Sequence, residues 1–185
     1  WDITDFGFGN FQTRGLTLFT IRNGHPDNLR SGKGEVYAEK ILVVHVDQVT
    51  PMHFHWIKTE DIINRGGGRL VVKLYNATED DKLDSSDVLV HVESVAGRMP
   101  AGGIVTLQPG ESITLTPRVY HAFWAEGERV FVGEVSSVND DAADNCFYES
   151  VGRFPDIEED VGPTRLLVND YKNFLLNYGN IWTPD

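Results

Sequence analysis

The segment from Pro51 to Glu60 contains the residue types that could bind a metal ion. His53 and His55 are separated by one residue, so in an extended strand their imidazoles point to the same face. Glu60 follows five residues later, after a short bend that could return its carboxylate towards the two rings. His121, in another strand-like and aromatic-rich segment, is the candidate for a fourth ligand. Three imidazoles and one carboxylate suit a divalent metal.

A His-x-His pair has a second interpretation, because two half-buried histidines in a strand can simply be hydrogen-bonded parts of the core. Glu60 and His121 favour the metal site. His-x-His-x4-Glu, followed by Gly67 and a distant third histidine, resembles the two metal-binding motifs of the cupin superfamily. Two positions depart from that pattern: Asp47 stands where a glycine usually precedes the first histidine, and the segment from Pro117 to His121 lacks the glycine of the second motif.

The resemblance extends to one branch of the cupins. The runs PMHFHWIKTEDIINRGGG, LTPRVYHAFWAEGE and NDDAADNCFYESVGRFPDIEED are similar to D-lyxose ketol-isomerases. Members of that family are cupin enzymes that interconvert aldose and ketose sugars with a divalent metal, typically manganese. The similarity covers roughly residues 33 to 162.

The resemblance also implies roles for residues outside the metal site. Glu149 would be the base that moves a proton between C1 and C2 of the sugar, and Lys40 would steer protons or polarise an oxygen. Asp140 and Arg153 would contact sugar hydroxyls. From the residues alone, Lys40 lies in an apolar strand, so it either caps that strand at the surface or reaches into a polar cavity. The loop 139–149 holds several acids, so the identity of the base stays open.

Composition bounds the possible functions. The 185 residues fit one domain, and 41% hydrophobic content is that of a globular protein. A formal net charge of −12 argues against nucleic acid and against an anionic membrane as partners. Cys146 is the single cysteine, which excludes an internal disulfide and suits a reducing compartment. No apolar run is long enough for a membrane helix. We therefore expect a cytoplasmic protein.

The chain alternates short strand-like segments with turns and shows almost no helical periodicity, which predicts an all-β fold, a cupin-type barrel or jelly roll with few short helices. We expect one cupin domain, with an edge segment at 1–32, a barrel core at 33–138, and a loop and C-terminal arm at 139–185 that could support a homodimer. One helical turn is predicted at 60–64, and the triple glycine 66–68 is interpreted as a tight corner.

The predicted function is a metal-dependent aldose–ketose isomerase acting on a small monosaccharide, D-lyxose or D-mannose. Two alternatives remain open. An iron-dependent cupin dioxygenase would use the same four ligands and bind oxygen and substrate at the free metal positions. A non-catalytic sugar-binding cupin, with its metal absent or structural, would bind a sugar and release it unchanged. Manganese is the expected ion, while cobalt, iron, nickel and zinc also fit three nitrogens and one oxygen.

Overall fold

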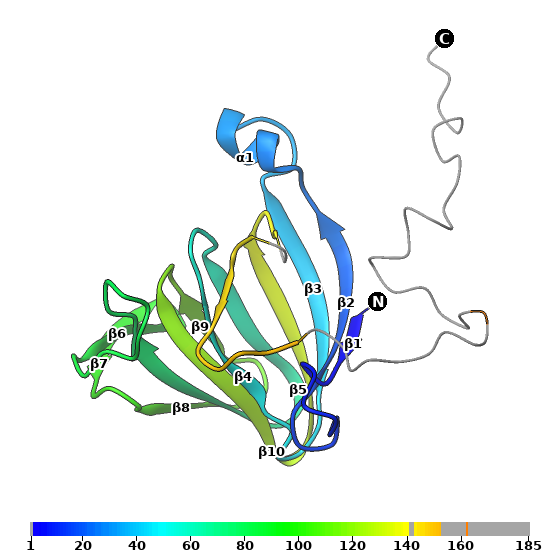
Figure 1. The fold of residues 1–185 in the computed structure, drawn as a ribbon, viewed down its shortest axis with the longest axis vertical. Coiled ribbons are helices and arrows are strands. Elements are labelled where there is room, and N and C mark those ends of the chain that lie inside the picture. The colour runs from blue at the N-terminus through cyan, green and yellow to red at the C-terminus, as the bar shows by residue number, and fades with distance from the viewer. Residues whose placement is uncertain (1, 141–142, 153–161, 163–185) are drawn as a thin grey trace.

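The computed structural model describes residues 2–140, 143–152 and 162, and these form a curled, strand-rich structure (Figure 1). The helix α1 (Pro26–Ser31) lies outside the sheet, at one end of β2 and β3. The strands are β1 (Asp2–Thr4), β2 (Leu16–Asn23), β3 (Tyr37–Val44), β4 (Thr50–His55), β5 (Glu60–Asn76), β6 (Val88–Val92), β7 (Val95–Met99), β8 (Ile104–Leu107), β9 (Ser112–Leu115), β10 (Val119–Ser137) and β11 (Asn145–Phe147).

The long strands β5 and β10 organise the fold, because they pair with each other along most of their length. The second half of β10 also pairs with β3, whereas its first half pairs with β4. Similarly, β5 carries β9 beside its first half and β8 beside its second half. Because β5 and β10 are bent and each half pairs with different strands, they bring two parts of the sheet face to face. The prediction of an all-β, jelly-roll fold is confirmed.

The triple glycine marks the bend in β5. Gly67 has a φ of 97°, and a Cβ atom at this position would collide with the carbonyl oxygen of Arg129 in β10. The corner therefore requires a residue without a side chain, as the sequence predicted. The predicted helical turn at 60–64 is wrong, because these residues begin β5. Ile62 and Ile63 are β-branched and pair with β9 and β10, where strand packing outweighs a local turn.

The hydrophobic core lies inside the curl and is built from alternate residues of the long strands. Each fully buried aliphatic or aromatic side chain of this kind contributes about 1.5–3 kcal/mol. The members of the core include Leu42, Val44, Ile62, Leu70, Leu74, Phe123, Val130 and Val132.

No helix in the described residues has the length and apolar character that a membrane span needs. The predicted C-terminal arm lies outside the described residues, apart from Gly162.

Candidate metal centre

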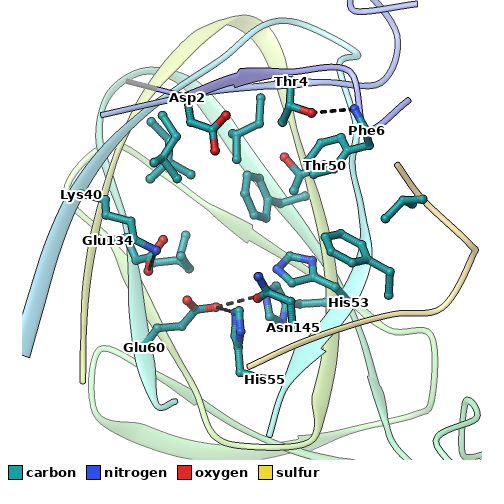
Figure 2. Close-up of a pocket in the computed structure, with 18 of the residues that line it drawn as sticks. Asp2, Thr4, Phe6, Lys40, Thr50, His53, His55, Glu60, Glu134 and Asn145 are labelled. Atoms are coloured by element: carbon teal, nitrogen blue, oxygen red, sulfur yellow. Dashed lines mark hydrogen bonds and ion pairs between the residues drawn. The ribbon is translucent and has the colours of Figure 1, made fainter. Parts of the chain in front are cut away.

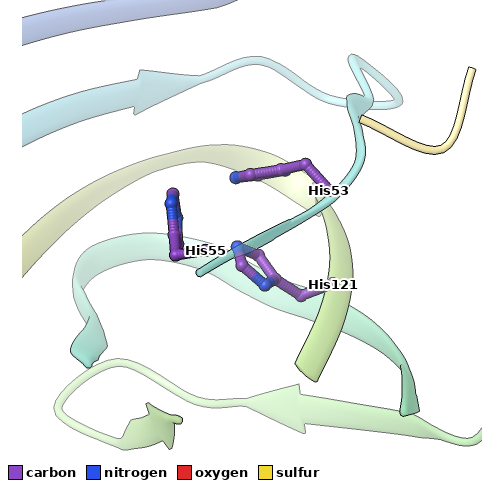
Figure 3. Close-up of side chains that lie close together, drawn as sticks. All are labelled: His53, His55 and His121. Atoms are coloured by element: carbon purple, nitrogen blue, oxygen red, sulfur yellow. The ribbon is translucent and has the colours of Figure 1, made fainter. Parts of the chain in front are cut away.

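Three histidines from two neighbouring strands converge inside the curl (Figure 3). His53 and His55 come from β4, and His121 comes from β10, where its Cα is paired with that of His53. One ring nitrogen of each histidine lies within 4.8 Å of those of the other two. All three side chains are buried. The pairing of β4 with β10 thus supplies the third imidazole that the sequence predicted.

The orientation of each imidazole is fixed by its Nδ1 atom, which contacts a backbone carbonyl oxygen. The contacts join His53 to Pro51 (2.8 Å), His55 to Asp144 (3.0 Å) and His121 to Val119 (3.0 Å). An Nδ1–H that donates to a carbonyl leaves the lone pair on Nε2, and this is how metal-binding histidines are usually held. The Nε2 atom of His121 is buried and makes no hydrogen bond within the described part of the chain.

Glu60, the first residue of β5, adds a carboxylate to this cluster. Its Oε1 atom lies 3.0 Å from Nε2 of His121 and 3.4 Å from Nε2 of His55. Asp144 fixes the bend that returns Glu60 to the histidines, since its carboxylate accepts hydrogen bonds from the backbone N–H groups of Ile57 and Lys58 at 2.8 and 2.9 Å. The predicted set of three histidines and one glutamate is therefore assembled in space.

Electrostatics keeps His53 and Glu60 in the protonation states that a metal ion needs. Burial, together with the neighbouring His121 and His55, holds the pKa of His53 well below its ordinary value, so the ring is neutral at pH 7. Burial alone would raise the pKa of Glu60, but the Lys58 ammonium and His55 outweigh it and lower that pKa. A neutral imidazole and an ionised carboxylate are both ready to coordinate.

Buried charges continue from Glu60 along one wall of the cavity. The Lys58 ammonium lies 2.7 Å from Oε2 of Glu60 and 2.8 Å from Oε1 of Glu134, and Lys40 lies 3.1 Å from the same Glu134 oxygen. Asn139 accepts a hydrogen bond from Lys40 at 2.6 Å. Burial opposes ionisation of Glu134, but Lys40 and Lys58 lower its pKa, so it remains a carboxylate.

A cavity of about 430 Å³ is lined by the three histidines and Glu60 together with Lys40, Lys58 and Glu134 (Figure 2). His55 and Glu60 lie at one end, Asp2 and Thr4 lie at the other, and apolar side chains line much of the remaining wall. A concave site with a few convergent polar groups is the usual form of a small-molecule site. The apolar lining includes Phe6, Leu16, Leu42, Ile62, Phe123 and Phe147.

The chain resembles known sugar isomerases in both sequence and fold. Residues 1–171 match the family model described as D-lyxose isomerase. The chain belongs to the D-lyxose isomerase family. A D-lyxose/D-mannose isomerase from Serratia proteamaculans is 52% identical over 178 residues, covering 95% of this chain and 77% of the relative. Another, from Escherichia coli O157:H7, is 50% identical over 176 residues, covering 94% and 77%.

A solved structure of Cellulomonas parahominis L-ribose isomerase with L-ribose has the same fold, with a TM-score of 0.58. It is 18% identical and covers 83% of this chain and 84% of its own. At this level of identity the match supports the cupin-like fold of this D-lyxose isomerase family member and says nothing about its substrate.

The donor set of this family member fits a divalent metal. His53, His55, His121 and Glu60 are buried, converge on one point, and present three nitrogens and one oxygen. Zinc, manganese, iron, cobalt and nickel all accept such ligands, so the donors identify the class of ion and not the element.

The remaining predicted site residues differ in where they lie. Lys40 lines the cavity and is 2% exposed, so its side chain reaches inward and does not cap the strand at the surface. Glu149 follows β11; its side chain is 55% exposed and forms an ion pair with Arg14 at 2.8 Å. Asp140 is exposed, and its Oδ1 accepts a hydrogen bond from a backbone N–H. Arg153 lies outside the described residues.

Two further charged residues line the cavity, and the sequence patterns did not predict either of them as a site residue. Lys58 is 3% exposed, and Glu134 is 4% exposed. The signal for Glu134 was its position in β10, where it shares the alternation of the buried Val130 and Val132. A carboxylate at an inward position of an apolar strand needs a partner or a function. Lys58 carries no comparable signal, because it lies in the bend between β4 and β5.

Proposed function

We propose that this member of the D-lyxose isomerase family is a metal-dependent aldose–ketose isomerase that interconverts D-lyxose with D-xylulose and D-mannose with D-fructose. The observation that carries the proposal is the buried cluster of three histidines and Glu60 at the end of a sugar-sized cavity. The names of the two relatives at 50% and 52% identity support the choice of sugars.

His53, His55, His121 and Glu60 would hold the metal ion. When bound, the ion would supply Lewis-acid polarisation of the sugar carbonyl. The rest of the cavity has two tasks: to bind the open-chain sugar away from bulk water and to move one proton between C1 and C2. The second task requires a carboxylate or another base within hydrogen-bond reach of that carbon.

Glu134 is our proposal for the base. Three carboxylates line the described part of the cavity, Asp2, Glu60 and Glu134, and Glu60 belongs to the metal site. Both lysines contact Oε1 of Glu134, so we assign the proton transfer to Oε2, with Lys40 steering protons to the sugar oxygens. Glu149 remains the competing proposal from the sequence, because Val151, two residues further on, lines the same cavity.

Two amide variants separate these proposals. We expect Glu134→Gln to lower kcat for D-mannose by about 10²–10⁴-fold, the range for loss of a general base, with metal content unchanged. Glu149→Gln should retain turnover within a few-fold, because it removes only an exposed ion pair with Arg14. Steady-state rates and bound metal are measured on both proteins. A collapse of kcat in Glu149→Gln alone would move the role to Glu149.

One experiment tests the function against its two alternatives. Metal-loaded protein is incubated with D-lyxose or D-mannose, the recovered sugar is identified by nuclear magnetic resonance, and oxygen is followed with an electrode. We expect D-xylulose or D-fructose and no oxygen uptake. Oxygen uptake coupled to sugar loss would favour a dioxygenase. Calorimetric binding of an unchanged sugar would favour a non-catalytic cupin.

The identity of the ion, the oligomeric state and the cellular location complete the proposal. We propose manganese as the ion, on the resemblance to the family. We also propose a homodimer, with the C-terminal arm as its support, and a cytoplasmic location, which is consistent with the single cysteine. Light scattering of the metal-loaded protein tests the dimer, since a mass near that of one 20.7 kDa chain would contradict it.

A further inference from the structure

Thr50, the first residue of β4, carries a buried hydroxyl group that has no partner. The residue is 2% exposed, and its Oγ1 atom makes no hydrogen bond to any part of the chain that the structure describes. Buried hydroxyls are normally satisfied, so one without a partner calls for an explanation. Thr50 also lines the cavity that holds the metal centre. The hydroxyl therefore lacks a partner at the wall of a cavity in which a bound molecule could supply one.

A β-bulge turns Thr50 towards that cavity. His53 is paired with His121, but Thr50 is paired with Phe123, so three steps along β4 match only two along β10. In a regular strand, residues three apart face opposite sides. The extra residue in β4 brings Thr50 to the same side as His53, and both line the cavity. Bulges beside active sites commonly re-aim a side chain in this way.

The position of Thr50 in the cavity indicates what it could contact. In Figure 2, Thr50 lies beyond His53, towards the end formed by Asp2 and Thr4 of β1, whereas His55 and Glu60 lie at the opposite end. Three residues of extended strand span about 10 Å, and the bulge shortens this span. A molecule held at the metal centre by one end would therefore pass Thr50 with its other end.

We propose that the Thr50 hydroxyl hydrogen-bonds a tail hydroxyl of the open-chain sugar, one remote from the two carbons that react, and so determines substrate specificity. This inference rests on the proposed function, since it takes C1 and C2 to lie at the metal centre. A threonine hydroxyl both donates and accepts, which matches a sugar hydroxyl. A site that provides such a partner discriminates against analogues lacking the hydroxyl.

The variants Thr50→Val and Thr50→Ser test the proposal. Valine has nearly the shape of threonine without the oxygen, and serine retains the hydroxyl. We expect Thr50→Val to lower kcat/KM for D-mannose about 10- to 100-fold, mainly through KM, with metal affinity and thermal stability close to those of the unmodified protein. Thr50→Ser should remain within a few-fold.

Deoxy sugars identify the hydroxyl concerned. D-mannose analogues lacking the oxygen at C4, C5 or C6 are assayed with the unmodified protein and with Thr50→Val. For one analogue, kcat/KM should be much lower than for D-mannose in the unmodified protein. In Thr50→Val the two sugars should give nearly the same kcat/KM, because the interaction is already missing there. Equal losses in the two proteins for every analogue would overturn the proposal, as would unchanged kinetics in Thr50→Val.

Failure of this inference can be distinguished from failure of the proposed function. If the unmodified protein forms no ketose, the isomerase proposal fails, and calorimetric binding of D-mannose to the two proteins then decides the role of Thr50. Weaker sugar binding by Thr50→Val alone would support it. A loss of metal affinity in Thr50→Val would instead mean that Thr50 acts by supporting His53, and would contradict a direct sugar contact.

Discussion

Replacing His121 with alanine is expected to abolish ketose formation and metal binding together. His121 supplies an Nε2 atom that is buried, makes no hydrogen bond in the described residues and lies 3.0 Å from Oε1 of Glu60. Residues that merely orient a metal ligand contribute about 10- to 100-fold to affinity, so loss of a ligand should exceed about 100-fold. Titration calorimetry with Mn²⁺ and a ketose assay measure both effects.

His91→Ala is the matched control. His91 lies in β6, where it is partly exposed and paired with Thr114 of β9, and it does not line the cavity. Metal affinity and turnover should therefore be unchanged. His121→Gln, which fills more of the site than alanine, separates loss of the ligand from loss of packing. Retention of one tightly bound ion in both His121 variants would contradict the assignment of His121 as a ligand.

Of the proposed variants, Lys58→Met is expected to show the largest loss in the free energy of unfolding. The Lys58 ammonium lies between Glu60 and Glu134, at 2.7 and 2.8 Å, and all three side chains are almost fully buried. Without it, Glu60 loses its only lysine contact in the described residues, and Glu134 keeps only the ammonium of Lys40. Removing one partner from a buried ion pair costs about 3–5 kcal/mol, because the remaining charge is left uncompensated. Urea unfolding of the metal-free variant measures the change.

Lys82→Met provides the comparison for Lys58→Met. Lys82 also pairs with a carboxylate, Asp80, at 2.6 Å, but its side chain is 73% exposed. Solvent screens such a pair, so the variant should unfold at nearly the same urea concentration as the unmodified protein. If the Lys58 and Lys82 variants were equally stable, the buried charges would not be coupled as the distances indicate.

The convergence of the four proposed metal ligands could be predicted because their spacing encodes geometry. One intervening residue places His53 and His55 on one face of a strand, and a fixed bend returns Glu60. The choice of His121 needed only a second strand close to the first, and β10 pairs directly with β4. The corner at the triple glycine was also predictable, because the absence of side chains allows close backbone approach. The error at 60–64 arose because Glu60 begins a strand whose length is set by pairing with distant β10.

The rest of the cavity depends on contacts that no local pattern contains. Lys58 lies in a bend, and its burial follows from the arrangement of Glu60 and Glu134, which are 74 residues apart in sequence. Thr50 faces the cavity only because of a bulge, which reverses the alternation expected for β4. Glu149 was favoured by resemblance, whereas the structure brings Glu134 to Lys40 through the pairing of β10 with β3.

The central claim is that the three histidines and Glu60 form a metal centre on which isomerisation depends. Metal-stripped protein is titrated with Mn²⁺, and bound metal and the initial rate of D-fructose formation from D-mannose are measured in the same samples. Both should rise in proportion and saturate at one ion per chain. Full activity in the stripped protein, or one bound ion without ketose, would contradict the account.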